Sequence, residues 1–489
     1  MTTILLLLIL IPAFTGIWSY FIRTDATRRL LWLITSLVHV IISIKAAYFT
    51  DYMLAEQWIG MDSLSALFLS LTSFLFFLVT IYGVGYVTRE PAEQRPDTET
   101  GGLLNNEPES VFTGSMLLFL SSMTLAILSR HLGLQWVAIE TTTLASAPLI
   151  YYHQNRRSLE AAWKYLILCS VGIAIALMGI FFIGLSLPQG VHDMTLLALL
   201  QNASRLDHRW LELAFILMLV GYGTKMGLAP MHTWLPDAHS EAPSPVSALL
   251  SGTLLNCAFL GILRIQQVLY AAGIASFGQD LLLIFGLVSI GTASIFLLGQ
   301  TDYKRMLAYS SVEHMGILSL GIGIGGLGVF GSLLQMINHS IVKVILFLSA
   351  GNIHSKFHTK AAASVKGLSK VMPVTAILWF TGYLAIVGSP PFGIFVSEFT
   401  ILRAAIGKHL WAAVILFMLF LIIAFIGITN VILPMIFGKA SMRRRRETFI
   451  ALLSASALAI LALNMGIWIP AWLDEVIRRA ALLLEGGMN

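Results

Sequence analysis

The chain has 489 residues, of which 57% are hydrophobic and only 11% are charged, and its formal net charge is +5. Soluble domains carry roughly 25% charged residues, so this composition excludes an ordinary soluble protein and predicts an all-α polytopic membrane protein. The basic residues stand mainly in short loops between apolar stretches, so we expect a lipid bilayer as partner and no nucleic acid.

Apolar stretches of about 20 residues recur along the chain and predict about fourteen transmembrane helices. They lie near 3–22, 30–50, 63–88, 111–129, 131–151, 161–186, 210–228, 244–270, 278–299, 307–328, 332–353, 372–406, 410–437 and 449–469. The first stretch lacks a basic leader and a clean cleavage site, so we interpret it as a span and not as a signal peptide. The segment 372–406 is too long for one straight helix, and "GSPPFG" (388–393) predicts a break inside the membrane.

The loops predict an orientation. With the N-terminus outside, inside loops hold eighteen of the thirty Lys and Arg residues, including "SMRRRRET" (441–448). Because inside loops are enriched in Lys and Arg, we expect a bacterial or archaeal cytoplasmic membrane protein with both termini outside. The polar loop 88–110 is interpreted as a linker, with a docking surface for an inside partner as the alternative.

Several ionisable residues lie deep in the predicted spans: Glu140, Lys164, Lys225, Glu313, His314, His339, Lys343 and Glu398. Each costs roughly 2.5–3.5 kcal/mol at a helix centre, so such residues usually face the bundle interior and often form proton relays. The alternative is that they are interfacial or form structural ion pairs between helices. His339 and Lys343 are spaced i, i+4, so they share one helix face.

Two Gly/Pro-rich breaks stand beside such residues. Gly227, Pro230 and Pro236 follow Lys225, and Pro390, Pro391 and Gly393 precede Glu398; non-helical backbone at this depth is tolerated only inside protein or beside water. Glu140 is the candidate partner of Lys225. If the two charges lie about 6 Å apart, at an effective dielectric near 20 they attract each other by roughly 3 kcal/mol, which favours the charged form of the lysine.

No metal site or cofactor is predicted. Cys169 and Cys257 stand far apart in apolar runs and indicate no disulfide framework, zinc site or iron–sulfur ligation. The histidines and aspartate of "HTWLPDAH" (232–239) form too thin a ligand set for a metal. Any redox chemistry is therefore expected in partner chains.

Three motifs carry a resemblance to a known family. "TKMGLAPMHTWLPDAHSEAPSPVSALLSG" (224–252), "QTDYKRMLAYSSVEHMG" (300–316) and "PPFGIFVSEF" (390–399) resemble the antiporter-like subunits of respiratory complex I, membrane-bound nickel–iron hydrogenases and Mrp-type antiporters. The similarity spans roughly residues 60 to 440, and the segment 131–174 is most similar to component F of the hydrogenase-4 and formate hydrogenlyase group.

The resemblance implies a fold of about fourteen helices with two inverted five-helix repeats and broken helices seven and twelve. The corresponding division is 1–110 (first helices and polar loop), 111–270 (first half-channel), 278–437 (second half-channel) and 449–489 (last helix and short tail). The proton relay that it implies consists of Glu140, Lys164, Lys225, His314, His339, Lys343 and Glu398. Span eight departs from many relatives, which carry a Lys or His where this chain has Ser251 and Asn256.

The function that these residues favour is proton translocation by a subunit of a redox-driven respiratory or hydrogenase-type complex. Its expected partners are other antiporter-like and small membrane subunits and a peripheral iron–sulfur, hydrogenase or dehydrogenase arm. One alternative is a subunit of an Mrp-type sodium/proton antiporter, and another is a non-conducting membrane scaffold. Sodium would need several hard oxygen ligands around one point, whereas the carboxylates of this sequence are isolated.

Overall fold

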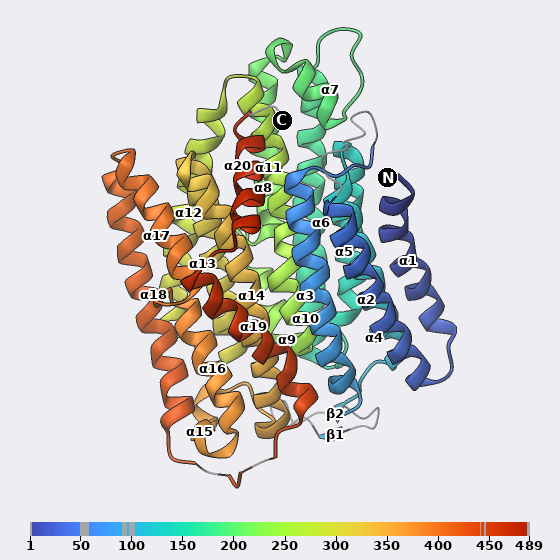
Figure 1. The fold of residues 1–489 in the computed structure, drawn as a ribbon, viewed down its shortest axis with the longest axis vertical. Helices are drawn as coiled ribbons and strands as arrows, with labels where there is room; N and C mark the ends of the chain where they lie inside the picture. The colour runs from blue at the N-terminus through green and yellow to red at the C-terminus, as the bar shows by residue number, and fades with distance from the viewer. Residues whose placement is uncertain are drawn as a thin grey trace.

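The computed structural model describes residues 2–48, 58–89, 95–96, 103–440, 442–444 and 446–486, and these are almost entirely helical. The helices stand side by side in one elongated bundle, with α1 (Thr2–Phe21) and α2 (Asp25–Tyr48) at one flank, α17 (Gly393–Gly407) and α18 (Trp411–Phe437) at the other, and the last two helices, α19 (Phe449–Ile467) and α20 (Ala471–Leu484), across the middle (Figure 1). The strands in these ranges are the two-residue β1 (Arg95–Pro96) and β2 (Leu103–Leu104), which pair antiparallel.

The first half of the chain forms the long apolar helices predicted from the sequence, with short helices between some of them. They are α1 (Thr2–Phe21), α2 (Asp25–Tyr48), α3 (Ser63–Val87), α4 (Glu109–Leu128), α5 (Leu132–Ile150), α6 (Arg156–Ser186), α7 (Leu196–Gln201), η1 (Ala203–Arg205), α8 (His208–Met226), α9 (Trp234–Glu241), α10 (Ser244–Leu249), the π-helical turn η2 (Leu250–Leu254) and α11 (Leu255–Ala271). Polar caps fix several starts: the side chains of Asp62, Asn155 and Asp207 accept hydrogen bonds from the first-turn amides of α3, α6 and α8.

The second half follows the same pattern. Its helices are α12 (Ala275–Leu297), α13 (Tyr303–Ile324), α14 (Leu327–Phe357), η3 (Ala362–Ser364), α15 (Leu368–Val371), α16 (Pro373–Ile386), α17 (Gly393–Gly407), α18 (Trp411–Phe437), α19 (Phe449–Ile467) and α20 (Ala471–Leu484).

Each of the fourteen predicted spans coincides with helical structure. Within the described ranges, nine helical segments are long and apolar enough to cross a membrane, and shorter apolar helices accompany them. The chain is therefore a multi-pass membrane protein, and the number of fourteen crossings stays a prediction.

The centre of the bundle is formed by two long segments. The apolar windows of α14 and of the continuous segment Ser244–Ala271 are completely buried. Around them, helices such as α6 and α18 turn large apolar side chains outward, among them Ile167, Phe181, Ile415 and Phe425. Such an exposed apolar shell is what a bilayer or a neighbouring membrane subunit would cover.

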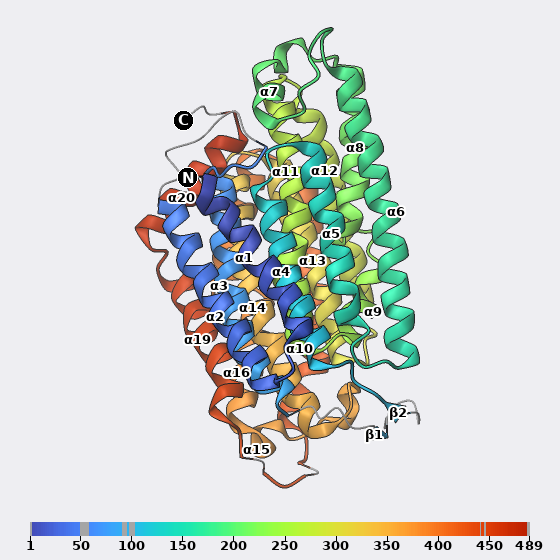
Figure 2. The same cartoon turned by 90° about the vertical axis from the view of Figure 1, so that its right-hand side faces the viewer.

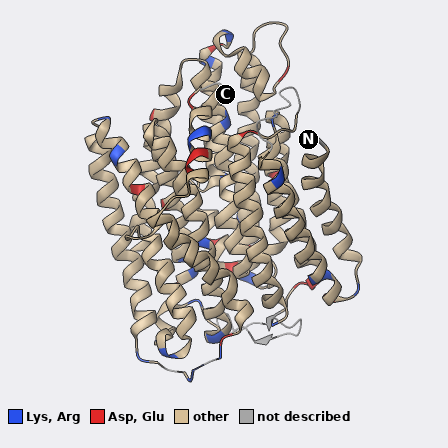
Figure 3. Ribbon diagram, viewed as in Figure 1, with Lys and Arg blue, Asp and Glu red and all other residues tan. Residues whose placement is uncertain are grey.

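The two ends of the bundle differ. The first and last described residues lie toward the same end, with α7, whereas α15 and the segment between α18 and α19 lie at the opposite end (Figures 1 and 2). That opposite end carries several of the Lys and Arg residues (Figure 3). Residues 90–94 and 97–102 of the predicted polar loop 88–110, and Ser441 and Arg445 of the Arg-rich stretch, lie outside the described residues.

Candidate functional site

The break after Lys225 lies where the sequence predicts it. Helix α8 ends at Met226, Gly227 has a φ of +83°, and helix α9 begins at Trp234. A positive φ suits glycine, and here a Cβ would also collide with Leu235. The backbone freed by the break finds partners, because the Trp234 indole donates to the Thr224 carbonyl over 2.8 Å.

The predicted break residues divide into two groups. Pro230 lies in the first break and Pro390 and Pro391 in the second, between α16 and α17. Pro236 and Gly393 lie instead just inside the helices that follow. Proline fits the first turn of a helix, because the amide it lacks would have no partner there.

Lys225 is completely buried among hydroxyl groups. Its Nζ donates to Thr143 Oγ1 of α5 and to Tyr165 OH of α6, each over 2.7 Å. The Tyr165 hydroxyl continues to Ser146 Oγ, 2.7 Å away, and Ser146 in turn donates to the Thr142 carbonyl. The hydroxyl groups replace part of the hydration of the ammonium group, which hydrocarbon could not do, and a hydroxyl can accept or donate a hydrogen bond. The site can therefore hold the amine in either protonation state.

Glu140 reaches Lys225 through one bridging group. Thr143 Oγ1 donates to Glu140 Oε2 over 3.3 Å while accepting from Lys225. The other carboxylate oxygen accepts from Ser170 Oγ over 2.7 Å. The structure thus brings the two residues that we expected to form a pair into one network, joined by a hydroxyl.

Lys164 does not lie in this network. Its side chain is 44% exposed and pairs with Glu160 at 2.7 Å and with Asp237 at 2.9 Å. Asp237 also pairs with Arg305 at 3.0 Å, so this group of charges joins α6, α9 and α13 near one rim of the bundle. The expectation that Lys164 lies deep among apolar side chains is therefore corrected, since helix phase turns its neighbour Tyr165 inward instead.

The second cluster surrounds Lys343, which is also completely buried on α14. Its Nζ donates to the Leu307 carbonyl over 2.6 Å and to Ser310 Oγ, both on α13. Glu313 follows Ser310 by three residues on the same helix face and is only 3% exposed. Glu313 interacts electrostatically with Lys343, so the second cluster also holds a lysine and a carboxylate.

Two histidine rings adjoin this cluster. His314 of α13 and His339 of α14 have ring centroids 4.9 Å apart. Gln335 Nε2 donates to His314 Nδ1 over 2.8 Å, so the Nε2–H of that ring points to the Ile386 carbonyl, 3.2 Å away. Among the described residues, neither nitrogen of His339 has a hydrogen-bond partner.

Glu398 lies on α17, the helix that follows the second break. Gly388, with a φ of +66°, faces the Glu398 carboxylate so closely that a Cβ would collide with it. Ser397, the preceding residue, donates to Gln335 Oε1. Because the same Gln335 amide donates to His314, the second turn of α17 and the histidine pair share one hydrogen-bond chain.

Predicted span eight contains two polar residues, Ser251 and Asn256, that contact the helices of the second cluster. Ser251, in the π-helical turn η2, forms a hydrogen bond of 2.8 Å with Ser311 of α13. Asn256 Nδ2 donates to Ser340 Oγ of α14 over 2.9 Å. A π-helical turn inside a span is often found at functional sites. Uncharged polar side chains of span eight thus contact both α13 and α14, the helices that carry the second cluster.

A third buried charge cluster was not predicted. Arg264 of α11 binds both carboxylate oxygens of Asp62, at 2.7 and 2.9 Å, and donates to Ser65 over 2.7 Å. Arg130 also pairs with Asp62. Burial alone would raise the pKa of the Asp62 carboxyl, but the two guanidinium charges hold it well below its ordinary value. Arg264 is thus the tie between α3 and α11.

Four residues that complete the site were not predicted from the sequence. Thr143, Tyr165, Ser310 and Gln335 are uncharged polar residues within apolar helices, and they are common enough to carry little signal alone. Glu313 was noted as buried but was left out of the predicted relay. A search for polar residues three or four positions from each buried charge would have found Thr143 beside Glu140 and Ser310 beside Glu313.

In the part of the chain that the structure describes, no group of three His, Cys, Asp or Glu residues could hold a metal ion. Cys169 and Cys257 are both buried as free thiols. The expectation of no cofactor in this chain stays a prediction.

Comparison with known proteins identifies the family. A sequence model for the family described as NADH:quinone oxidoreductase/Mrp antiporter, TM, matches residues 129–427, which is more than half of the chain. A hydrogenase-4 component F homolog of Methylacidiphilum infernorum is 41% identical over 355 residues, covering 71% of this chain and 72% of that protein. Hydrogenase-4 component B of Escherichia coli is 29% identical, and this chain spans about half of its length (53%).

The fold is also known. A chain of the membrane-bound sulfane sulfur reductase, an archaeal respiratory membrane complex, superposes with a TM-score of 0.87 at 23% identity, covering 98% of this chain and 97% of that one. At this identity the likeness shows the fold alone. The sequence matches, together with this fold, show that the chain belongs to the NADH:quinone oxidoreductase/Mrp antiporter family and is an antiporter-like membrane subunit of the type found in hydrogenase and quinone-oxidoreductase complexes.

Proposed function

We propose that this chain moves protons across the membrane as a subunit of a redox-driven, hydrogenase-type complex. The observation that carries the proposal is the pair of buried lysines, Lys225 and Lys343, each in a hydroxyl-lined cluster with a carboxylate nearby. Buried ionisable groups of this kind are expensive, and proton relays are a common reason for their presence in membrane proteins.

In the first cluster, Glu140 and Lys225 would act as the switching pair. The bridging Thr143 hydroxyl can accept a proton from the ammonium side and donate one toward the carboxylate, as its two hydrogen bonds already do. Movement of Glu140 away from Thr143 would weaken the field that keeps the ammonium charged. Lys225 would then release its proton toward the centre of the bundle.

The passage between clusters would run through span eight. Ser251 forms a hydrogen bond with Ser311, which donates to the Leu307 carbonyl. Lys343 donates to the same carbonyl, so a series of polar groups leads from η2 to the second lysine. Buried polar atoms normally pair with protein or ordered water. Within the described residues, Asn256 Oδ1 and the His339 nitrogens lack protein partners, and we expect water molecules there to complete the passage.

The second cluster would pass the proton onward. Lys343 lies beside Glu313, and the His314, Gln335 and Ser397 side chains form a chain toward Glu398 at the second break. Glu313 therefore joins the predicted relay residues. The role of Lys164 as a relay member stays a prediction; its ion pair with Asp237 favours a place at the rim, where a proton could enter.

We further propose that the fourteen helical ranges all cross the membrane and that ten of them, the fourth to eighth and the ninth to thirteenth, form two inverted five-helix repeats. The two helix breaks support this arrangement, because each includes a positive-φ glycine, Gly227 or Gly388, near an ionisable side chain. The basic end of the bundle would face the cytoplasm, which places both termini outside.

The energy would come from partner chains. Moving one proton against 100 mV costs about 2.3 kcal/mol. We expect a peripheral iron–sulfur, hydrogenase or dehydrogenase arm to supply it, with other membrane subunits covering the exposed apolar shell. The names of the matched relatives support a hydrogenase-type assembly.

The proposal is tested with the intact complex in sealed vesicles that contain a fluorescent pH probe. Turnover of the electron donor should drive proton uptake that persists in sodium-free buffer and in the presence of a sodium ionophore. Uptake that requires sodium, or that disappears when the sodium gradient is dissipated, would support the sodium/proton antiporter instead. Turnover without any proton movement would support the scaffold.

A further inference from the structure

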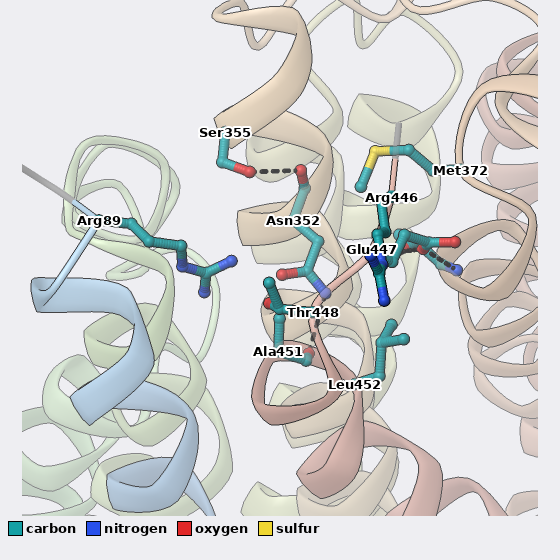
Figure 4. Close-up of a pocket in the computed structure, with 10 residues that line it drawn as sticks. Arg89, Asn352, Ser355, Met372, Arg446, Glu447, Thr448, Ala451 and Leu452 are labelled. Atoms are coloured by element: carbon teal, nitrogen blue, oxygen red, sulfur yellow. Dashed lines mark hydrogen bonds between the residues drawn. The ribbon is translucent and has the colours of Figure 1, made fainter. Parts of the chain in front are cut away.

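A pocket at the basic end of the bundle lies apart from the proton path. It lies where the ends of α3 and α14, the start of α16 and the start of α19 meet (Figure 4). Arg89 reaches into it from the end of α3, and Arg446 faces it from the segment before α19. Two guanidinium groups from distant parts of the sequence thus converge on one concave surface.

The floor of the pocket is fixed by hydrogen bonds. Asn352 Nδ2 donates to the Ala451 carbonyl over 3.0 Å, and Tyr82 OH donates to Asn352 Oδ1 over 3.2 Å. On the same helix, Ser355 Oγ donates to the Asn352 carbonyl over 2.8 Å. Arg89 is held as well, since its Nε donates to the Gly85 carbonyl over 2.7 Å and its terminal nitrogens extend into the pocket (Figure 4).

Glu447, the acidic residue that lines the pocket, is already hydrogen-bonded to the backbone. Both carboxylate oxygens of Glu447 accept hydrogen bonds at the start of α16, from the Val374 amide at 3.0 Å and the Thr375 amide at 2.7 Å. The positive end of the helix dipole and these amides offset its charge. The two arginines therefore give the pocket a net positive character that favours an anion.

The surroundings of the pocket are amphipathic. Ala451 and Leu452 line its inner side, and the outward face of α19 continues with the exposed apolar residues Phe449, Ile450 and Leu453. A charged mouth above an apolar surface matches the boundary between phospholipid headgroups and acyl chains, and basic pockets between helices at this depth bind phosphate-bearing headgroups.

We propose that this pocket binds a phosphate group, with Arg89 and Arg446 as its ligands and Thr448 as a hydroxyl donor. The planar guanidinium group of an arginine can donate two parallel hydrogen bonds to two oxygens of one phosphate. The apolar face of α19 favours an anionic phospholipid as the source of the phosphate, and free phosphate in solution is the other source. A bound headgroup would hold α19 against α3 and α14.

The test uses the full-length protein in its complex, in bilayers of phosphatidylcholine with a minority of phosphatidylglycerol. Native mass spectrometry measures how much phosphatidylglycerol stays bound. We expect retention by the unmodified protein and at least about a tenfold loss in the variant with Arg89→Gln and Arg446→Gln. The double variant with Arg443→Gln and Arg444→Gln is the matched control, because it also removes two positive charges, at exposed residues before α19 that do not line the pocket.

A conservative variant and a measurement with inorganic phosphate distinguish the remaining outcomes. The Arg446→Lys variant should retain the lipid in part, and native-like helix content by circular dichroism shows that each variant is folded. If millimolar inorganic phosphate raises the melting temperature and this effect needs both arginines while no lipid is retained, the phosphate group is correct and its source is the solution. Equal phosphatidylglycerol retention in the Arg89→Gln, Arg446→Gln variant and in the Arg443→Gln, Arg444→Gln control overturns the proposal.

Discussion

The hydroxyl of Thr143 is the point at which the proposed switch can be tested most finely. It lies 2.7 Å from Lys225 Nζ and 3.3 Å from Glu140 Oε2, so the charged groups are at most about 6 Å apart and interact by roughly 3 kcal/mol at an effective dielectric near 20. Thr143→Val keeps the branched shape and this Coulombic interaction. It removes a hydrogen bond to a charged group, which contributes about 1.5–3 kcal/mol.

If the hydroxyl carries the proton between the two residues, this loss should slow coupled proton uptake by about ten- to a hundredfold. The assay is the initial rate of uptake by the intact complex in vesicles, compared at equal amounts of assembled complex. Thr143→Ser keeps the hydroxyl and should be close to native. Thr141→Val, on the exposed face of the same helix, is the matched control and should have no effect. Native uptake in an assembled Thr143→Val complex would refute the bridging role.

Three other predictions follow from the buried and rim charges. Glu313→Gln should assemble and lose most proton uptake, since Lys343 loses a carboxylate that interacts with it electrostatically. Uptake within twofold of native would remove Glu313 from the path. Lys164→Met should change stability by less than about 1 kcal/mol in thermal unfolding, because its pair with Asp237 is partly exposed; a larger loss would mean that this rim cluster is a structural tie. Asp62→Asn should destabilise the protein by about 3–5 kcal/mol at neutral pH, because Arg264 then lies buried without a counter-charge. As the pKa of Asp62 is lowered in the folded state, its contribution should be complete above the unfolded-state value of about 3.9 and disappear only as the pH falls further. Equal melting temperatures of Asp62→Asn and the native protein at pH 7 would contradict this.

Local signals explain what could be predicted from the sequence. A lysine within an apolar run and the Gly/Pro residues after it are visible one by one, so the break at Gly227 and the buried position of Lys225 followed directly. The apolar runs likewise predicted the helical ranges, with errors of a few residues at their ends. The pairing of Glu140 with Lys225 was inferred from charge, and the structure adds the bridging Thr143.

What could not be predicted depends on helix phase and on long-range contacts. Lys164 and Tyr165 are adjacent in sequence, yet only Tyr165 faces Lys225, because α6 turns one side chain inward and the next outward. Arg264 was not among the buried ionisable residues predicted from the sequence. Its carboxylate partner Asp62 is 202 residues away, and no periodicity in the sequence reveals such a contact.

The central claim is that Lys225 is a functional proton carrier and not a structural residue. The most direct test is proton uptake by the intact complex in vesicles with Lys225→Met, alongside a native gel that shows assembly. The account predicts an assembled complex whose turnover-coupled proton uptake is lost or greatly reduced. An assembled Lys225→Met complex that pumps at the native rate would contradict the account and make the lysine a structural element of the fold.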